Sequence, residues 1–287
     1  MKQLLILSGK GGTGKTTIAS AFIKLSDAGA YADCDVDAPN LHLITGWNSE
    51  PEKSDYYGLP TALINPELCI KCDRCRENCR FGAISAEEGY RVNSFTCEGC
   101  GVCQYVCPVD AITLIPAVAG ELKLYSDKEK VFSTAQLKMG KVTSGMLVTE
   151  VKKQMKAAAA DVEISIIDGS PGIGCPVIAS LSGVDMVLIV AEPSISCISD
   201  MERILNTAGK FGVKAAVCIN KFDTNIKNTE KIEEFCKEQG LLFVGRIPFD
   251  YYAVKAINKG QTIVDVVCPA GTAVKAVYEK AIKLLWD

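Results

Sequence analysis

The sequence has almost no excess charge of either sign, one histidine and no long apolar run. It carries 31 lysines and arginines against 34 aspartates and glutamates, a formal net charge of −3. So small a charge provides no basic field for a nucleic-acid partner. No apolar run approaches the ~20 residues that span a bilayer, and residues 1–8 lack the apolar core and cleavage site of a signal peptide. We therefore expect a cytoplasmic protein without an integral membrane segment, and we interpret His42, in an apolar stretch, as a packing residue.

Cysteine is the residue in excess, with 14 in the chain. In a cytoplasmic protein we expect reduced thiols or metal ligands rather than disulfides. Eight of them form a C-x2-C-x2-C-x3-C run that occurs twice, 28 residues apart: Cys69, Cys72, Cys75 and Cys79, then Cys97, Cys100, Cys103 and Cys107. Two repeats too small to bury a core of their own need metal to hold them together.

Three closely spaced thiolates and one remote thiolate suit the corners of a cubane cluster, and the block resembles a bacterial ferredoxin with two [4Fe–4S] clusters. In such ferredoxins the fourth cysteine of each run binds the other cluster. The resemblance therefore implies one cluster on Cys69, Cys72, Cys75 and Cys107 and a second on Cys79, Cys97, Cys100 and Cys103. The repeat departs from the ferredoxin pattern where Arg80, rather than proline, follows Cys79, and this charge is expected to shift the potential of the nearby cluster. Two zinc sites are the alternative, although such sites prefer C-x2-C pairs to triplets.

On either side of this block, short apolar segments alternate with amphipathic segments of helical period. The apolar segments, rich in valine and isoleucine, span 3–7, 30–33, 163–168, 186–191, 213–220 and 241–247; the amphipathic ones span 16–26, 144–160, 198–211, 229–239 and 272–286. This alternation is typical of an α/β fold with a mostly parallel sheet flanked by helices. We expect a discontinuous domain of residues 1–60 and 117–287, interrupted by a small α+β ferredoxin-like insertion of residues 61–116.

A glycine-rich motif follows the first apolar segment. The sequence Gly9-Lys10-Gly11-Gly12-Thr13-Gly14-Lys15-Thr16 satisfies G-x-x-x-x-G-K-[ST] and leads through Thr17 into a helical pattern, which is the context of a P-loop. Its glycines let successive backbone N–H groups point at phosphate oxygens. Lys15 is predicted to bind the β- and γ-phosphates, and the Thr16 hydroxyl to bind Mg²⁺. A glycine turn without a ligand is the alternative, against which the strand-to-helix context argues.

The additional lysine gives the motif the K-G-G-x-G-K-T form, which resembles the deviant Walker A ATPases of the MinD/ParA superfamily. This resemblance implies ATP hydrolysis with catalytic roles for Lys10 and Lys15. It also implies that Lys10 reaches across a dimer interface to the partner's ATP, so that two nucleotides lie between the subunits. The alternative is an exposed lysine on a loop.

Two acidic segments extend the resemblance. Residues 33–40, D-C-D-V-D-A-P-N, resemble the first switch of that superfamily, and residues 168–174, D-G-S-P-G-I-G, its Walker B and second switch. The resemblance implies that Asp35 positions the attacking water and that Asp33, Asp35 and Asp168 form a Mg²⁺ site with Thr16. Three carboxylates placed this close would repel one another without a cation nearby. Aspartates that cap the following helix are the alternative.

Later segments match adenine-binding and cluster-binding positions of the same superfamily. Asn220 follows one predicted strand, and Pro248 and Asp250 follow the next, as the adenine-binding residues do. Cys175 lies seven residues after Asp168, the spacing of a cluster ligand in the nitrogenase iron protein. No matching second cysteine is found, so we interpret Cys175 as a small thiol packed beneath the second switch, and the remaining scattered cysteines as core.

The whole pattern resembles MinD-superfamily ATPases that contain an inserted ferredoxin domain. The expected cofactors are ATP or ADP, Mg²⁺ and two [4Fe–4S] clusters. The expected function is ATP-dependent closure of a dimer, homomeric or with a related ATPase, that gates electron transfer to a redox partner. One alternative is an assembly factor that delivers clusters or a metallocofactor to an apo-metalloprotein. A positioning ATPase with structural clusters is another.

Overall fold

The computed structural model describes residues 1–47, 49–87, 89–159 and 161–287. Its main sheet has nine strands in the order β13-β12-β11-β1-β10-β2-β9-β8-β3. All six predicted strands are present in it: β1 (Lys2–Leu7), β2 (Ala30–Asp33), β10 (Ile164–Asp168), β11 (Met186–Ala191), β12 (Lys214–Asn220) and β13 (Leu242–Ile247). They pair in parallel, so their carboxyl ends, and the loops that follow them, gather at one edge of the sheet.

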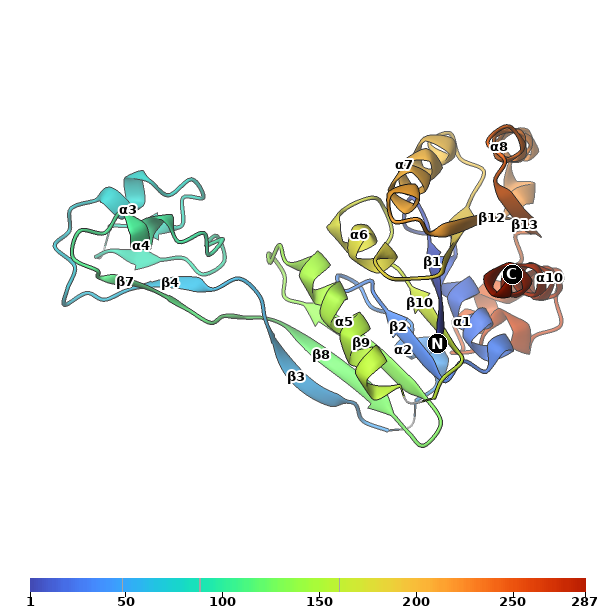
Figure 1. Cartoon of the computed structure of the whole chain (residues 1–287), viewed down its shortest axis with the longest axis horizontal. Helices are drawn as coiled ribbons and strands as arrows, with labels where there is room; N and C mark the ends of the chain where they lie inside the picture. Colours follow the sequence, from blue (N-terminus) through green and yellow to red (C-terminus); the bar gives the residue numbers. More distant parts are fainter. Residues whose placement is uncertain (48, 88, 160) are drawn as a thin grey trace.

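Helices cover both faces of this sheet (Figure 1). One face carries α1 (Lys15–Ser26), α2 (His42–Thr45), α9 (Tyr251–Ile257) and α10 (Pro269–Trp286), and the other carries α5 (Ser144–Ala158), α6 (Cys175–Leu181), α7 (Cys197–Lys210) and α8 (Ile226–Glu238). Two short 3₁₀ turns, η1 (Phe222–Thr224) and η2 (Ile263–Asp265), connect them. Side chains of β1 alternate between the two layers: Leu4 and Ile6 pack with α1 and α10, whereas Leu5 and Leu7 pack with α5, α6 and α7. Such double burial explains why these strands carry apolar residues at successive positions.

Three strands depart from the expected organisation. Residues 52–57, which fall in none of the predicted strands or helices, form β3 (Glu52–Tyr57), and the chain returns through β8 (Val118–Ser126) and β9 (Val131–Leu137). β9 pairs in parallel with β2, while β8 lies antiparallel to both β9 and β3. β3 escapes prediction because all of its side chains except Tyr56 are exposed, so it lacks the apolar signal of a buried strand. The predicted end of one helix, Ala160, lies outside the described residues.

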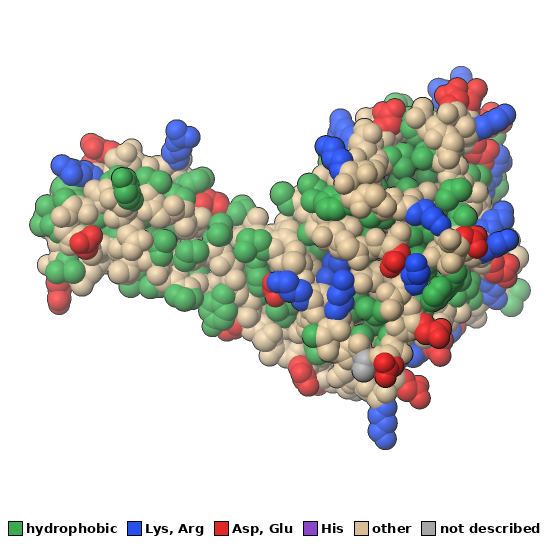
Figure 2. Space-filling model, in the orientation of Figure 1, with side chains coloured by type: hydrophobic (Ala, Val, Ile, Leu, Met, Phe, Trp, Pro, Cys, Tyr) green, Lys and Arg blue, Asp and Glu red, His purple; other side chains and the backbone are tan. Residues whose placement is uncertain are grey.

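Residues 61–116 project from the rest of the chain as a small lobe, joined to it by the segments that link β3 to β4 and β7 to β8 (Figure 1). We call these residues the cysteine lobe and the remainder the body. The lobe holds two antiparallel pairs, β4 (Thr61–Ile64) with β7 (Ile112–Ile115) and β5 (Ile84–Ser85) with β6 (Arg91–Val92), and the single turns α3 (Arg74–Glu77) and α4 (Val102–Tyr105). Figure 2 shows a notch between the lobe and the body. Among the described residues, no helix has both the length and the apolar character needed to cross a membrane.

Candidate functional site

The P-loop connects β1 to α1 at the edge where the parallel strands end. Gly14 has a φ of +90°, a conformation that side-chain-bearing residues rarely adopt. It also lies directly against the end of β12, since a Cβ on Gly14 would sit 2.3 Å from Asn220 Nδ2. The same Nδ2 donates a hydrogen bond to the Thr13 carbonyl over 2.7 Å. Asn220 therefore holds the P-loop in shape, in addition to lying where adenine recognition is predicted.

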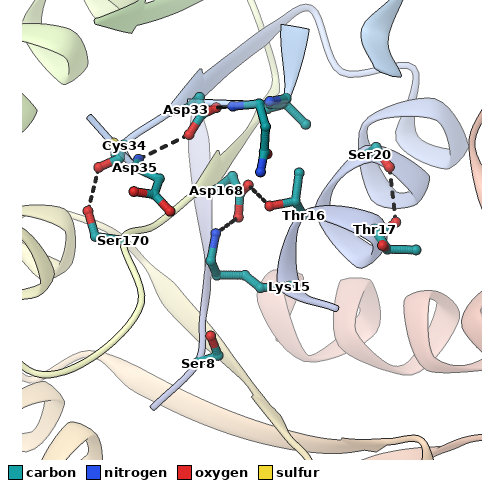
Figure 3. A network of polar contacts seen from close by, with 12 residues as sticks. Ser8, Lys15, Thr16, Thr17, Ser20, Asp33, Cys34, Asp35, Asp168 and Ser170 are labelled. Carbon is teal, nitrogen blue, oxygen red and sulfur yellow. Dashed lines mark hydrogen bonds and ion pairs between the residues drawn. The ribbon is translucent and has the colours of Figure 1, made fainter. Parts of the chain in front are cut away.

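The P-loop lysine and threonine both contact the carboxylate at the end of β10 (Figure 3). Lys15 Nζ forms an ion pair with Asp168 Oδ1, and Thr16 Oγ1 donates to Asp168 Oδ2 over 2.7 Å. Burial disfavours the Lys15 ammonium, but the charge and hydrogen bond of Asp168 outweigh it, so the pKa of Lys15 is raised. In this state the lysine predicted to bind phosphate is held by a carboxylate predicted to belong to the Mg²⁺ site.

Asp33 and Asp35 lie near Asp168, on the side away from Thr16 (Figure 3). The Asp33 carboxylate accepts backbone N–H bonds from Asp35, Asn40 and Leu41 over 3.0, 2.9 and 3.0 Å. It thus shapes the turn that follows β2. Complete burial, together with the negative charge of Asp168, raises the pKa of Asp33 to about 7. Burial also raises the pKa of Asp35, against the effect of Lys15, so each of these carboxylates would gain from a cation.

Lys10 is held within its own subunit. Its Nζ lies 2.5 Å from Glu192 Oε1, just after the end of β11. The other oxygen of Glu192 is 3.5 Å from Lys221 Nζ, and Lys221 donates to the Gly12 carbonyl over 2.7 Å. Glu192 was not predicted; its one signal is that it follows the end of β11, the strand that pairs with β1.

A cavity of about 190 Å³ opens beside the P-loop. It is lined by the predicted nucleotide residues Gly14, Thr17, Asn220, Pro248 and Asp250, together with apolar side chains of α9. The Asp250 carboxylate caps α9 by accepting from Tyr252 N over 2.8 Å and also accepts from Ala270 N over 3.2 Å. Although burial opposes it, these backbone donors lower the pKa of Asp250. Asp250 thus shapes the cavity wall, and direct contact with a base stays a prediction.

In the lobe, the eight repeat cysteines surround two separate cavities. Cys79, Cys97, Cys100 and Cys103 line one of about 20 Å³, and Cys69, Cys72, Cys75 and Cys107 line another of about 20 Å³. These are the two groups that the ferredoxin resemblance implies, each with three cysteines from one run and one from the other. Nowhere among the described residues do three or more His, Cys, Asp or Glu side chains converge as ligands of a single metal ion.

The two halves of the lobe use equivalent backbone contacts. Cys79 Sγ accepts an N–H bond from Ala83 over 3.3 Å, and Cys107 Sγ accepts one from Ala111 over 3.3 Å. N–H donors to sulfur are among the factors that set the potential of an iron–sulfur cluster. The surroundings differ: Tyr90 lines the cavity of Cys72 and donates to Asp73 over 2.8 Å, whereas Phe81 and Val102 line the other cavity.

The remaining cysteines agree with the predictions except at one position. Cys34, Cys197, Cys218, Cys236 and Cys268 are buried, as expected for core residues. Cys175 is exposed at the first residue of α6, so its interpretation as a packed thiol was wrong. The glycine-rich segment that precedes α6 leaves this position at the surface, which the spacing from Asp168 could not reveal.

The fold and the site together define a nucleotide-binding α/β protein of the P-loop class. Residues 4–263 match the CobQ/CobB/MinD/ParA nucleotide-binding domain family, and the chain belongs to it. The uncharacterized protein MJ0578 of Methanocaldococcus jannaschii is 32% identical over 283 residues, 97% of this chain and 95% of that protein. A shorter match, to the pyruvate synthase subunit PorD of the same organism, is 33% identical and covers 24% of this chain and 81% of PorD.

Solved structures show the same fold. The septum site-determining protein MinD of Pyrococcus horikoshii, solved with Mg-ADP, superposes with a TM-score of 0.60 at 17% identity, over 99% of this chain and 96% of that one. An ATP complex of McdA from Cyanothece gives a TM-score of 0.58 at 19% identity, over 98% and 96% of the two chains. The predicted α/β fold with a mostly parallel sheet, and the predicted MinD/ParA family, are thus confirmed.

Proposed function

We propose that this protein is an ATPase in which the nucleotide state of the body controls electron transfer through two [4Fe–4S] clusters in the cysteine lobe. One observation carries the proposal: the eight repeat cysteines surround two cavities, four to each, in a lobe attached to a P-loop body. The partial similarity to PorD adds a hint of iron–sulfur binding.

The donor set fits clusters better than single ions. Each group consists of thiols only, and thiolates are the ligands of iron–sulfur clusters. Zinc sites of four cysteines prefer C-x2-C pairs, whereas each of these groups takes three cysteines from one C-x2-C-x2-C run and the fourth from the other run. A bound cluster would supply one-electron chemistry, and the apolar walls around Ile84 and Ile112 would limit solvent access to it.

The body fits MgATP. Hydroxyl and carboxylate oxygens, the ligands that Mg²⁺ prefers, are offered by Thr16, Asp35 and Asp168, while Asp33 shapes the adjoining turn. Lys15 must leave Asp168 to reach phosphate, which frees that carboxylate for the magnesium site. In this proposal Asp35 orients the attacking water, and Asn220 and Pro248 line the adenine cavity.

Dimer closure connects the two chemistries. Dimerisation is typical of this family, and a lysine at position 10 that reaches the partner's nucleotide would be engaged only in the closed ATP state. Because ATP binds the closed dimer more tightly than the open one, it favours the arrangement of the lobes in the closed dimer. Hydrolysis then lets the dimer open. The acceptor would be a redox protein that contacts the lobe.

The test is an anaerobic titration of the holoprotein followed by EPR. Cluster potentials are measured without nucleotide, with MgADP and with a non-hydrolysable MgATP analogue. Coupling of about 1–3 kcal/mol corresponds to shifts of roughly 40–130 mV for a one-electron couple. A shift of this size supports the proposal, while equal potentials and equal transfer rates in all three states, or stoichiometric zinc without sulfide, would refute it.

A second candidate is an ATP-dependent assembly factor. The exposure of Cys72 and Cys100, one in each group, favours it, because an exposed ligand lets an acceptor thiol displace a cluster. MgATP-dependent transfer of a cluster from this protein to an apo-protein, with loss of its own iron, would establish this candidate in place of the first.

A further inference from the structure

The loop that precedes helix α5 contacts the cysteine lobe. In this loop, Lys141 Nζ donates to the Ser94 carbonyl over 2.9 Å, three residues before the cluster-predicted Cys97. The segment that leads into the lobe also packs here: a Cβ on Gly58 would lie 2.9 Å from Thr143 Oγ1. The loop before α5 therefore positions the lobe both through a polar contact and through close packing of the lobe's connecting segment.

The same helix is fastened to α6, which follows the second switch. Lys152 of α5 is only 5% exposed, and its Nζ donates to the carbonyls of Ser180 and Ser182 over 2.6 Å each and to Ala179 over 3.3 Å. These carbonyls form the C-terminal end of α6, where a cation is favoured by the orphan acceptors and the helix dipole. A second contact lies near the other end of α6, since a Cβ on Gly145 would be 3.0 Å from Cys175 Cβ.

We infer that α5 transmits the state of the nucleotide site to the cysteine lobe, with Lys152 as the positioning residue toward α6 and Lys141 as the positioning residue toward the lobe. This inference rests on the proposed function and specifies its route. Residues 169–174 run from Asp168 directly into α6, and Gly172 N donates to the Ser8 carbonyl at the start of the P-loop over 3.0 Å. A phosphate that draws Lys15 away from Asp168 changes the conformation of residues 169–174 and so displaces α6. Helix α5 moves with α6 because the buried Lys152 joins them.

The route differs from the one that the chain order suggests. In sequence, the lobe follows the first switch through residues 41–60. In the structure, that connection includes β3, which pairs with β8 as the edge of the main sheet. A strand fixed in a sheet passes on little movement, whereas two packed helices have the freedom to slide as a unit. The lobe is thus expected to respond to the second switch rather than to the first.

The experiment measures amide hydrogen exchange in the anaerobic holoprotein without nucleotide, with MgADP and with a non-hydrolysable MgATP analogue. The readout is the protection of residues 91–97, around the Ser94 contact. Coupling between sites is typically about 5- to 150-fold in an equilibrium constant, so we expect protection in the wild type to differ by at least ~5-fold between the ADP and ATP-analogue states.

Lys141→Ala should abolish this nucleotide dependence, while the matched control Lys138→Ala, in the same loop, should keep it. Lys152→Met should also abolish it and retain nucleotide binding, with Lys153→Met on the exposed side of α5 as its control. If Lys152→Met does not fold, the Lys141 pair decides the question alone. A wild-type difference that persists in Lys141→Ala overturns the α5 route and leaves the proposed function standing. Absence of any difference in the wild type, with unchanged cluster potentials, overturns both.

Discussion

Replacement of Gly14 by alanine should damage the nucleotide site through one side chain, Asn220. The new Cβ would sit 2.3 Å from Asn220 Nδ2, so this amide must move and release the Thr13 carbonyl that it now binds over 2.7 Å. Leaving a buried acceptor unpaired costs about 1–3 kcal/mol. The left-handed backbone adds about 1–2 kcal/mol for any residue with a Cβ. Gly12→Ala is the matched control, because Gly12 has a φ of +80° but no atom within 4 Å of its Cβ position.

The assay is thermal unfolding of the nucleotide-free variants. The difference between them isolates Asn220, and about 1–3 kcal/mol corresponds to a melting temperature roughly 2–6 °C lower for Gly14→Ala than for Gly12→Ala. Adding Asn220→Ala to Gly14→Ala removes the clash, so the double variant should be less destabilised than the sum of the two single changes. Equal melting temperatures for the two glycine variants, with additive effects of the Asn220 change, would refute this account of the P-loop.

Three further results are expected. Glu192→Gln releases Lys10 from a half-exposed ion pair that contributes about 0.2–1 kcal/mol. Half-maximal dimerisation, followed by light scattering, should then need about 1.4- to 5-fold less ATP. An equal effect of Glu192→Gln in a Lys10→Ala background would contradict this role of the ion pair. Cys72→Ser should remove or convert one cluster, as seen by iron analysis and EPR, and leave the nucleotide affinity nearly unchanged. Loss of both the cluster and the nucleotide affinity would argue against an independent lobe. Because burial beside Asp168 raises the pKa of Asp33 from 3.8 to about 7, its protonated form stabilises the nucleotide-free protein fully below pH ~4, and this contribution is lost as the pH rises to about 7. The melting-temperature increase caused by MgADP should therefore grow between pH 6 and 8, and a flat profile would exclude Asp33 as the titrating group.

The predictable parts of the fold are those with a local signal. β1, β10 and β11 are buried on both faces, so each shows apolar residues at successive positions in the sequence. β3 has no such run, because as an edge strand of exposed residues it is held by backbone pairing with β8. That pairing brings together residues more than 60 positions apart, and no periodicity within six residues reports it.

The site divides in the same way. The P-loop and the cysteine runs are consecutive in the chain, so their spacing alone indicates phosphate and cluster chemistry. Glu192 could not be found, because it is an ordinary charged residue whose partners, Lys10 and Lys221, lie in two other loops. Lys152 has a helical pattern around it that is typical of an exposed lysine, and only the position of α6 explains its burial.

The size of the lobe argues that its metal and its contact with the body depend on each other. Among the residues that the structure describes, its hydrophobic cluster has five buried members, Ala62, Ile64, Cys75, Ile84 and Ile112, whereas two extensive clusters stabilise the body, with no lobe residue among their described buried members. So small a core needs bound metal to stay folded. The Ser94 carbonyl keeps its place against Lys141 only while the lobe is folded, so loss of a cluster would also remove the contact through which we infer that α5 acts. A lobe without its clusters would therefore no longer respond to the nucleotide bound in the body. For this reason, cluster content and nucleotide response have to be measured on the same preparation.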